Sequence, residues 1–177
     1  MNDYSFIQHN SPIHHSPFTI ISGSFMIGIV VVTHNQLGDA LIDSAEIIIG
    51  KRPESVVSVT TDGHPDELRE KIALGVRAVD RKKGVLILTD MFGGTPSDLS
   101  FSFLEEGRVD VICSVNLPIL IKAVNSRKGM NLSDLAKCLE AYGKKSISLA
   151  SGILKGQKRA PVSLCPFGPE CGQAHCA

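Results

Sequence analysis

The sequence lacks a net charge, because 18 Lys and Arg residues balance 18 Asp and Glu residues in a chain of 177. Proteins that bind the phosphate backbone of nucleic acids present an excess of positive charge, so we expect no nucleic-acid partner. Long hydrophobic runs are also lacking. The longest, Met26 to Val32, has the length of a strand and falls short of the roughly 18 residues that span a membrane. We therefore expect a chain that does not cross a bilayer.

The first 25 residues contain neither Lys nor Arg, and Pro12 and Pro17 interrupt their only weakly apolar stretch. A secretory signal peptide has a basic start and an uninterrupted apolar segment, so the sequence predicts a cytoplasmic protein. These residues also show neither strand alternation nor helical periodicity. We expect them to be an extension outside the fold, from an early translation start or a vector, with Met26 as the true start.

Cysteines are few and irregularly placed, so a disulfide framework for the core is not expected. Of the five, Cys165, Cys171 and Cys176 crowd into the last 13 residues. Together with His175 they offer zinc-type ligands, but the adjacent His175 and Cys176 and the lack of CxxC spacing fit a tetrahedral site poorly. We expect no metal and no other cofactor. Residues 156–177, rich in Pro and Gly, are predicted to be a disordered tail.

Four runs of strand character stand out in a chain that is 43% apolar, which is enough for one globular core. The runs cover residues 26–33, 55–60, 85–89 and 108–115. The first and third lack polar alternation, as is typical of strands buried on both faces of a parallel sheet. Helical segments separate the runs. The sequence therefore predicts an α/β domain over residues 26–155, with a doubly wound, mostly parallel sheet and helices on both faces.

The helical segments are predicted from apolar periodicity and capping residues. The first helix is expected to bury one face, formed by Leu37, Leu41, Ala45 and Ile48. Gly50 ends this helix. Further helices are predicted to begin at Pro65, Thr95 and Asn116. A last helix is expected from Asn131 to Gly143, and residues 146–151 (SISLAS) predict a final strand.

Doubly wound sheets bind ligands beyond the carboxyl ends of their strands, where His34 and Asp90 are expected. His34 directly follows the first strand and Asp90 the third. Because these two strands can be neighbours, the carboxylate is expected near the imidazole. A carboxylate bonded to one ring nitrogen fixes the tautomer and leaves the other nitrogen nucleophilic. Taken separately, His34 could equally be an ordinary surface histidine. Asp90 alone could be a residue that forms the turn at the end of the third strand.

The segment Gly93-Gly94-Thr95-Pro96-Ser97-Asp98 has the outline of an anion site. Thr95 is predicted to cap a helix, with Pro96 at its first position and Asp98 completing a capping box. Gly93 and Gly94 then allow close approach of a phosphoryl group to the backbone. The same residues could also form only a tight turn between a strand and a helix. Their combination with His34 and Asp90 favours a phosphohistidine site.

Further residues near this edge of the sheet are candidates for lining the site: Thr33, Phe92, Ser97, Asn116 and Pro118. The glycine loop lacks the Gly-Lys-Ser/Thr sequence that a nucleotide phosphate loop requires. ATP is therefore not expected to be the phosphoryl donor.

Three segments, MIGIVVVTHNQLGDAL, GVLILTDMFGGTPSDLS and VNLPILIKAV, carry a family resemblance. Over about residues 26–155 the chain closely resembles the enzyme IIA components of the mannose/fructose family of the bacterial phosphotransferase system. The resemblance implies that His34 is the phosphorylated residue, that Asp90 supports it and that Thr95 contacts the phosphoryl group. One departure is Asn35, where a glycine is common in relatives.

The resemblance also implies a sheet of four parallel strands with an additional antiparallel edge strand, here residues 146–151, contributed across a homodimer. It implies a phosphotransferase that accepts a phosphoryl group from the phosphocarrier protein HPr and passes it to a IIB component. Contact with a membrane would then be only indirect, through the permease components.

Two other functions remain open. A regulator could use the phosphorylation state of His34 to control partner binding instead of feeding a sugar permease. A receiver domain would instead use Asp90 as its phosphoacceptor, but such domains carry an acidic pair after the first strand, where this chain has Thr33 and His34.

Overall fold

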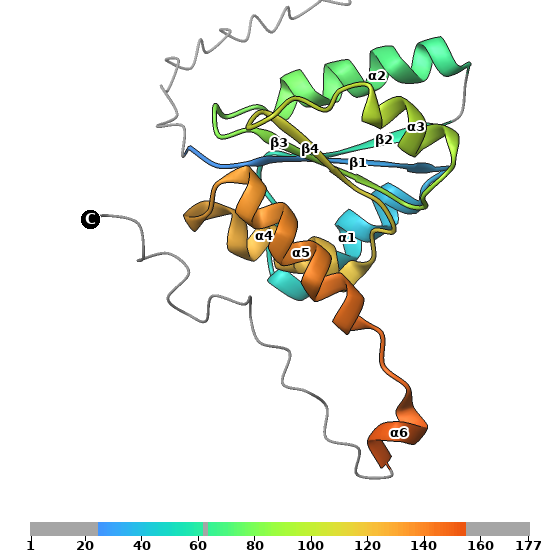
Figure 1. Cartoon of the computed structure of the whole chain (residues 1–177), viewed down its shortest axis with the longest axis vertical. Helices are drawn as coiled ribbons and strands as arrows, with labels where there is room; N and C mark the ends of the chain where they lie inside the picture. Colours follow the sequence, from blue (N-terminus) through green and yellow to red (C-terminus); the bar gives the residue numbers. More distant parts are fainter. Residues whose placement is uncertain (1–24, 62–63, 155–177) are drawn as a thin grey trace, which may run out of the picture.

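One parallel sheet organises residues 25–61 and 64–154, which the computed structural model describes (Figure 1). Its four strands within these residues are β1 (Gly28–His34), β2 (Val56–Thr61), β3 (Val85–Thr89) and β4 (Val109–Ile112). They lie in the order β2-β1-β3-β4. From β1 the chain adds β2 on one side and then returns to add β3 and β4 on the other side. The strand order therefore reverses between β1 and β3, and open α/β sheets bind ligands at such a switch point.

The central strands β1 and β3 are buried throughout, apart from His34 at the end of β1. This confirms the prediction drawn from their uninterrupted apolar sequences. The edge strands β2 and β4 are mostly half-buried, and β4 is shorter than the predicted run of residues 108–115.

Helices cover both faces of the sheet, as predicted (Figure 1). On one face α1 (Leu37–Ile49), α4 (Leu117–Ser126) and α5 (Leu132–Ser146) pack over Ile29 and Val31. On the other face α2 (Pro65–Val79) packs over Val30 and Val32, with α3 (Thr95–Phe101) beside it. Side chains alternate across a strand, so consecutive residues of β1 supply the two apolar cores. A short 3₁₀ helix, η1 (Arg127–Gly129), and α6 (Ala150–Leu154) complete the described elements.

The predicted face of α1 is partly wrong. Leu37 and Ile48 are exposed, whereas Gly38, Ile42 and Ala45 are the buried positions. A Cβ at Gly38 would lie 2.9 Å from a side-chain oxygen of β2 and 3.0 Å from one of β1. The backbone of α1 therefore approaches the sheet closely at this glycine, and the neighbouring Leu37 is exposed. Gly50 does end the helix, in the left-handed conformation with φ 81°.

The predictions for the carboxyl-terminal part of the domain need correction. α5 does not stop at Gly143 but continues to Ser146, and residues 146–151 form no strand in the described part of the chain. A Cβ at Gly143 would lie 2.7 Å from the Cδ1 atom of Ile119, so this glycine allows α5 to approach α4 closely. The antiparallel edge strand is accordingly absent from the described residues.

Several predictions concern segments that the structure does not describe. The extension before Met26 and the tail over residues 156–177, with its cysteines and His175, lie outside the described residues except for Phe25. No helix within residues 25–61 and 64–154 is long and apolar enough to cross a membrane. The same residues contain no cluster of three or more His, Cys, Asp or Glu side chains suited to a metal ion.

Candidate functional site

The order of the strands brings His34 and Asp90 together at the carboxyl edge of the sheet. His34 is the last residue of β1, and Asp90 directly follows β3, its neighbour. The Nδ1 atom of His34 lies 2.8 Å from Oδ2 of Asp90, and the backbone N–H of His34 donates to the same oxygen at 2.8 Å. One carboxylate oxygen therefore holds both the backbone and the ring of the histidine.

Asp90 is itself firmly placed and ionised. Its Oδ1 atom accepts a hydrogen bond from the backbone N–H of Met91 at 2.9 Å. Partial burial is the largest single influence on Asp90 and raises its pKa. The backbone and ring hydrogen bonds from His34, helped by the His34 charge and the Met91 N–H, outweigh that effect and hold the pKa below its ordinary value.

An ionised carboxylate can only accept hydrogen bonds, so Nδ1 of His34 is the protonated ring nitrogen. In a neutral imidazole the lone pair then lies on Nε2. The side chain of His34 is 48% exposed while that of Asp90 is only 11% exposed. The half-exposed imidazole thus lies nearer to solvent than the carboxylate that holds its Nδ1 atom.

The loop of Gly93, Gly94 and Thr95 lies beside the imidazole. A Cβ placed on Gly94 would be 3.5 Å from the Cε1 atom of His34, so the backbone runs close to the ring. Gly93 has a backbone φ of 77°, a conformation that residues other than glycine rarely adopt. Thr95 is exposed at the first position of α3.

The start of α3 differs from the prediction by one residue. Gly94, rather than Thr95, precedes the helix, and Ser97, rather than Asp98, closes the capping arrangement. The Gly94 N–H donates to Oγ of Ser97 at 3.1 Å, and this hydroxyl donates to the Gly94 carbonyl at 2.8 Å. The fully buried Ser97 therefore shapes the loop and does not face solvent.

The remaining candidate residues lie at the same edge of the sheet in different roles. Thr33 is buried, and its hydroxyl accepts from the backbone N–H of Gly38 at 2.8 Å, which anchors the start of α1 behind His34. Asn116 caps α4 by accepting from the N–H of Ile119 at 2.9 Å, and it donates to the Ser146 hydroxyl at 3.2 Å. Pro118 is exposed in the first turn of α4.

Exposed apolar side chains occur in the segments that directly follow His34 and Asp90, and of these only Phe92 was predicted to line the site. We call Leu37, Met91 and Phe92 the apolar collar, since all three are large and exposed. Phe92 is 73% exposed, and its ring centroid lies 6.1 Å from that of Phe101 on α3. Apolar residues in a loop next to the site, Met91 and Phe92, were the available signal in the sequence.

Asn35 has an explanation in the backbone. It follows His34 with φ 49°, in the left-handed region that glycine adopts freely and that Asn tolerates better than most residues. Asn35 therefore adopts a backbone conformation that glycine would also adopt where the chain leads from β1 towards α1.

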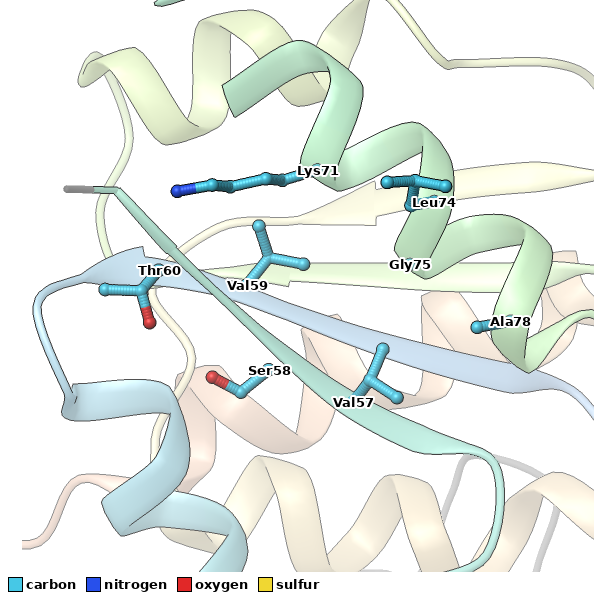
Figure 2. A pocket seen from close by; sticks show the side chains of 8 residues that line it. All are labelled: Val57, Ser58, Val59, Thr60, Lys71, Leu74, Gly75 and Ala78. Atoms are coloured by element: carbon cyan, nitrogen blue, oxygen red, sulfur yellow. The ribbon is translucent and has the colours of Figure 1, made fainter. Parts of the chain in front are cut away.

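The groove shown in Figure 2 lies elsewhere, along the outer edge of β2 beneath α2. Its volume is about 440 Å³, and its lining residues are Val57, Ser58, Val59, Thr60, Lys71, Leu74, Gly75 and Ala78. None of these is a candidate site residue. His34 thus lies outside this groove, on a half-exposed edge of the sheet.

The sequence that builds this doubly wound domain and its edge with His34 and Asp90 matches a known protein family. Residues 28–140 match the model of the "PTS system fructose IIA component" family. The chain belongs to this family of the phosphotransferase system, and the matched residues lie inside the predicted domain of residues 26–155.

Known proteins extend this result. The chain is 31% identical to the "PTS system fructose-specific EIIA component" of Bacillus subtilis, over 76% of this chain and 94% of that protein. A crystal structure of "phosphotransferase system component EIIA from Streptococcus agalactiae" aligns with TM-score 0.63 and 30% identity, covering 71% of this chain and 98% of that one. The chain is also 27% identical to the "Transcriptional regulatory protein LevR" of Bacillus subtilis, over 80% of this chain but only 15% of that protein.

Proposed function

We propose that this IIA component is a phosphocarrier that accepts a phosphoryl group from HPr on His34 and passes it to a IIB component. The observation that carries the proposal is the contact of 2.8 Å between Nδ1 of His34 and the ionised Asp90, which leaves Nε2 as the nucleophile. The relatives named as EIIA components support the same role.

In the proposed transfer, the lone pair of Nε2 attacks the phosphorus atom of the donor. The new Nε2–P bond forms as the bond between phosphorus and the donor nitrogen breaks, and the donor nitrogen keeps that electron pair. The proton on Nδ1 stays in its hydrogen bond to Asp90, whose negative charge stabilises the imidazolium that results. Gly93, Gly94 and Thr95 are proposed to contact the phosphoryl oxygens.

Both proposed partners are proteins, and the apolar collar suits such a partner. Large exposed apolar side chains next to a reactive group are typical of a docking surface. A partner that covers Leu37, Met91 and Phe92 would bring its own reactive group to His34 and exclude water from the transfer. We propose that these encounters take place in the cytoplasm.

We propose further that the chain forms a homodimer through residues 147–154, the C-terminal arm. Figure 1 shows α6, the end of this arm, standing off from the helices that cover the sheet. The arm exposes four large apolar side chains, Ile147, Leu149, Ile153 and Leu154. Such a series is unfavourable in water and is expected to pack against a second copy.

Regulation through His34 is the second candidate, and the similarity to LevR is the observation that speaks for it. Because the chain covers only 15% of that protein, the similarity extends to one part of a larger regulator. An aspartyl-phosphate switch is less suited to the site, since both oxygens of Asp90 already accept hydrogen bonds and its side chain is 11% exposed.

The test is the intact mass of the protein after incubation with phosphoenolpyruvate, enzyme I and HPr. We expect one phosphoryl group that requires HPr, is lost in acid and resists hydroxylamine. His34→Ala should abolish the adduct, and Asp90→Asn should slow its formation because the imidazole loses its orienting charge. The matched control is His64→Ala, which removes another exposed histidine at the start of α2.

Two results would overturn the proposal. One is an adduct of unchanged mass in the His34→Ala protein, and the other is an adduct sensitive to hydroxylamine, which would point to Asp90. Transfer from His34 to a IIB component then separates the carrier from the regulator, because a purely regulatory protein would hold the phosphoryl group without delivering it.

A further inference from the structure

The hydroxyl of Ser97 is placed where it can control the geometry of the phosphohistidine. Ser97 is fully buried in the first turn of α3, and its Oγ atom is bonded to both polar groups of a single residue, Gly94. The Gly94 N–H donates to Oγ at 3.1 Å, and Oγ lies 2.8 Å from the Gly94 carbonyl oxygen. One side chain thus contacts this glycine at both its N–H and its carbonyl, and the backbone N–H of Asp98 donates to the same carbonyl at 3.0 Å. The Gly94 N–H is held by Ser97.

Gly94 in turn is the part of the loop that lies against the reactive ring. The position of a Cβ on Gly94 is 3.5 Å from Cε1 of His34, the carbon bonded to both ring nitrogens. Any shift of Gly94 therefore changes the space beside Nε2. Gly94 has no side chain of its own to hold it, and with φ −113° and ψ 165° it lies in an extended conformation outside the helix.

We propose that Ser97 is a positioning residue for phosphoryl transfer, which holds the Gly94 backbone at the distance from His34 that the phosphoryl group requires. The inference rests on the proposed function and adds to it a residue that touches neither the imidazole nor the phosphoryl group. It also means that the Gly94 N–H is committed to Ser97. Of the three loop residues proposed to contact the phosphoryl group, Gly94 therefore lies against it without donating, and the hydrogen bonds come from Gly93 and Thr95.

Ser100 provides a matched control from the same helix. It is equally buried, and its hydroxyl donates to the backbone carbonyl of Pro96 at 2.6 Å. Both serines therefore support α3 through one side-chain hydroxyl. Only Ser97 is bonded to Gly94, so a general loss of helix stability should affect the two variants alike, and a positioning role should affect one.

The experiment compares Ser97→Ala and Ser100→Ala with the wild type in the transfer of phosphate from phosphorylated HPr, over a range of HPr concentrations. We expect Ser97→Ala to lower kcat by roughly 10-fold to 100-fold, as displacements of catalytic geometry do, while KM for HPr stays within about twofold. Ser100→Ala should keep kcat near the wild-type value. Thermal melting of all three proteins reports any common structural effect.

The proposal is overturned if Ser97→Ala loses no more kcat than Ser100→Ala, or if its loss appears in KM. Should Ser97→Ala fail to fold, Ser97→Cys replaces it, because a thiol has nearly the size of the hydroxyl but forms a weaker hydrogen bond. We expect the same selective fall in kcat for this variant. An unchanged kcat overturns the proposal. Failure of the proposed function is distinguishable, because the wild type would then form no adduct at His34.

Discussion

At the scale of single residues, the site depends on one carboxylate with two functions. Asp90 places the imidazole through the ring and backbone of His34, and it remains ionised although its side chain is only 11% exposed. The hydrogen bonds that lower its pKa are the same ones that orient His34. The orientation of His34 and the stability of the fold are therefore linked through this residue.

The pH dependence of stability follows from this linkage. The pKa of Asp90 in the folded protein lies below the ordinary value of 3.8, so the carboxylate stabilises the fold above that pH and loses this effect as the pH falls through the lowered value. In urea unfolding, we expect wild type to exceed Asp90→Asn in stability at neutral pH, and the difference to shrink below pH 3.8. A difference that is constant with pH would contradict the account.

Asn35 makes a second prediction at this scale. Because its φ of 49° lies in the left-handed region, Asn35→Gly should stay within about 0.5 kcal/mol of wild type in the free energy of unfolding. Asn35→Val should cost about 1–2 kcal/mol, since a β-branched residue is strained in that conformation. Urea denaturation measures both, and equal stability of the two variants would disprove the conformational explanation.

Phe92 tests the apolar collar. If the collar docks HPr, Phe92→Ser should raise KM for phosphorylated HPr by roughly fivefold to tenfold and leave kcat nearly unchanged. The control is Ile47→Ser on α1, since Ile47 is 82% exposed but lies near the end of the helix remote from His34. Similar values of KM in the two variants would exclude Phe92 from the docking surface.

At the scale of elements, η1 is joined to the sheet by a buried cation. Arg127 is 3% exposed. Its guanidinium donates to the carbonyls of Ile27 and Ser55 at 3.1 and 3.2 Å, and to that of Glu54. These carbonyls lie at the amino ends of β1 and β2. Burial lowers the pKa of Arg127, and the charge of Glu54 partly offsets this. Arg127 thus holds the edge of the sheet opposite to His34.

Arg127→Ala should lower the free energy of unfolding by about 2–4 kcal/mol, because each buried carbonyl that loses its donor costs about 1–3 kcal/mol. Lys128→Ala removes an exposed cation from the same 3₁₀ helix and should change stability by less than about 0.5 kcal/mol. Urea unfolding compares the two. Phosphoryl acceptance at His34 should survive in folded Arg127→Ala, and its loss would show that the two edges of the sheet are coupled.

Sequence patterns predicted the elements well where burial is complete and less well where it is partial. β1 and β3 lie in the centre of the sheet, so their apolar runs have a single explanation. The buried face of α1 was harder to predict, because a glycine lies on it close to the sheet beside the apolar Ile42 and Ala45. Periodicity counts apolar residues and takes no account of close approach at Gly38.

At the scale of the whole molecule, the exposed C-terminal arm determines what is expected in solution. Ile147 is 85% exposed in the single chain. We expect light scattering to give twice the mass of one chain for wild type and the mass of one chain for Ile147→Asp. Ile47→Asp, at a residue equally exposed on α1, should remain a dimer. A wild-type monomer, or a dimeric Ile147→Asp, would contradict the arm as the interface.

The class of fold and the central strands could be read from the sequence, and so could the expected contact between His34 and Asp90. Long apolar runs, capping signals and the segments around His34 and Asp90 are local in the chain, and local patterns need no knowledge of what packs against them. The order of the strands, which brings residues 34 and 90 into contact, was predicted only as one arrangement that parallel sheets allow.

The tertiary structure alone decided the continuation of α5 past Gly143 and the fate of residues 146–151. Neither can be read from a local pattern, because Gly143 packs against Ile119 of another helix and residues 146–151 have no neighbouring strand among the described residues. Propensity favours a helix or a strand for such segments, and packing against distant residues determines which of them forms.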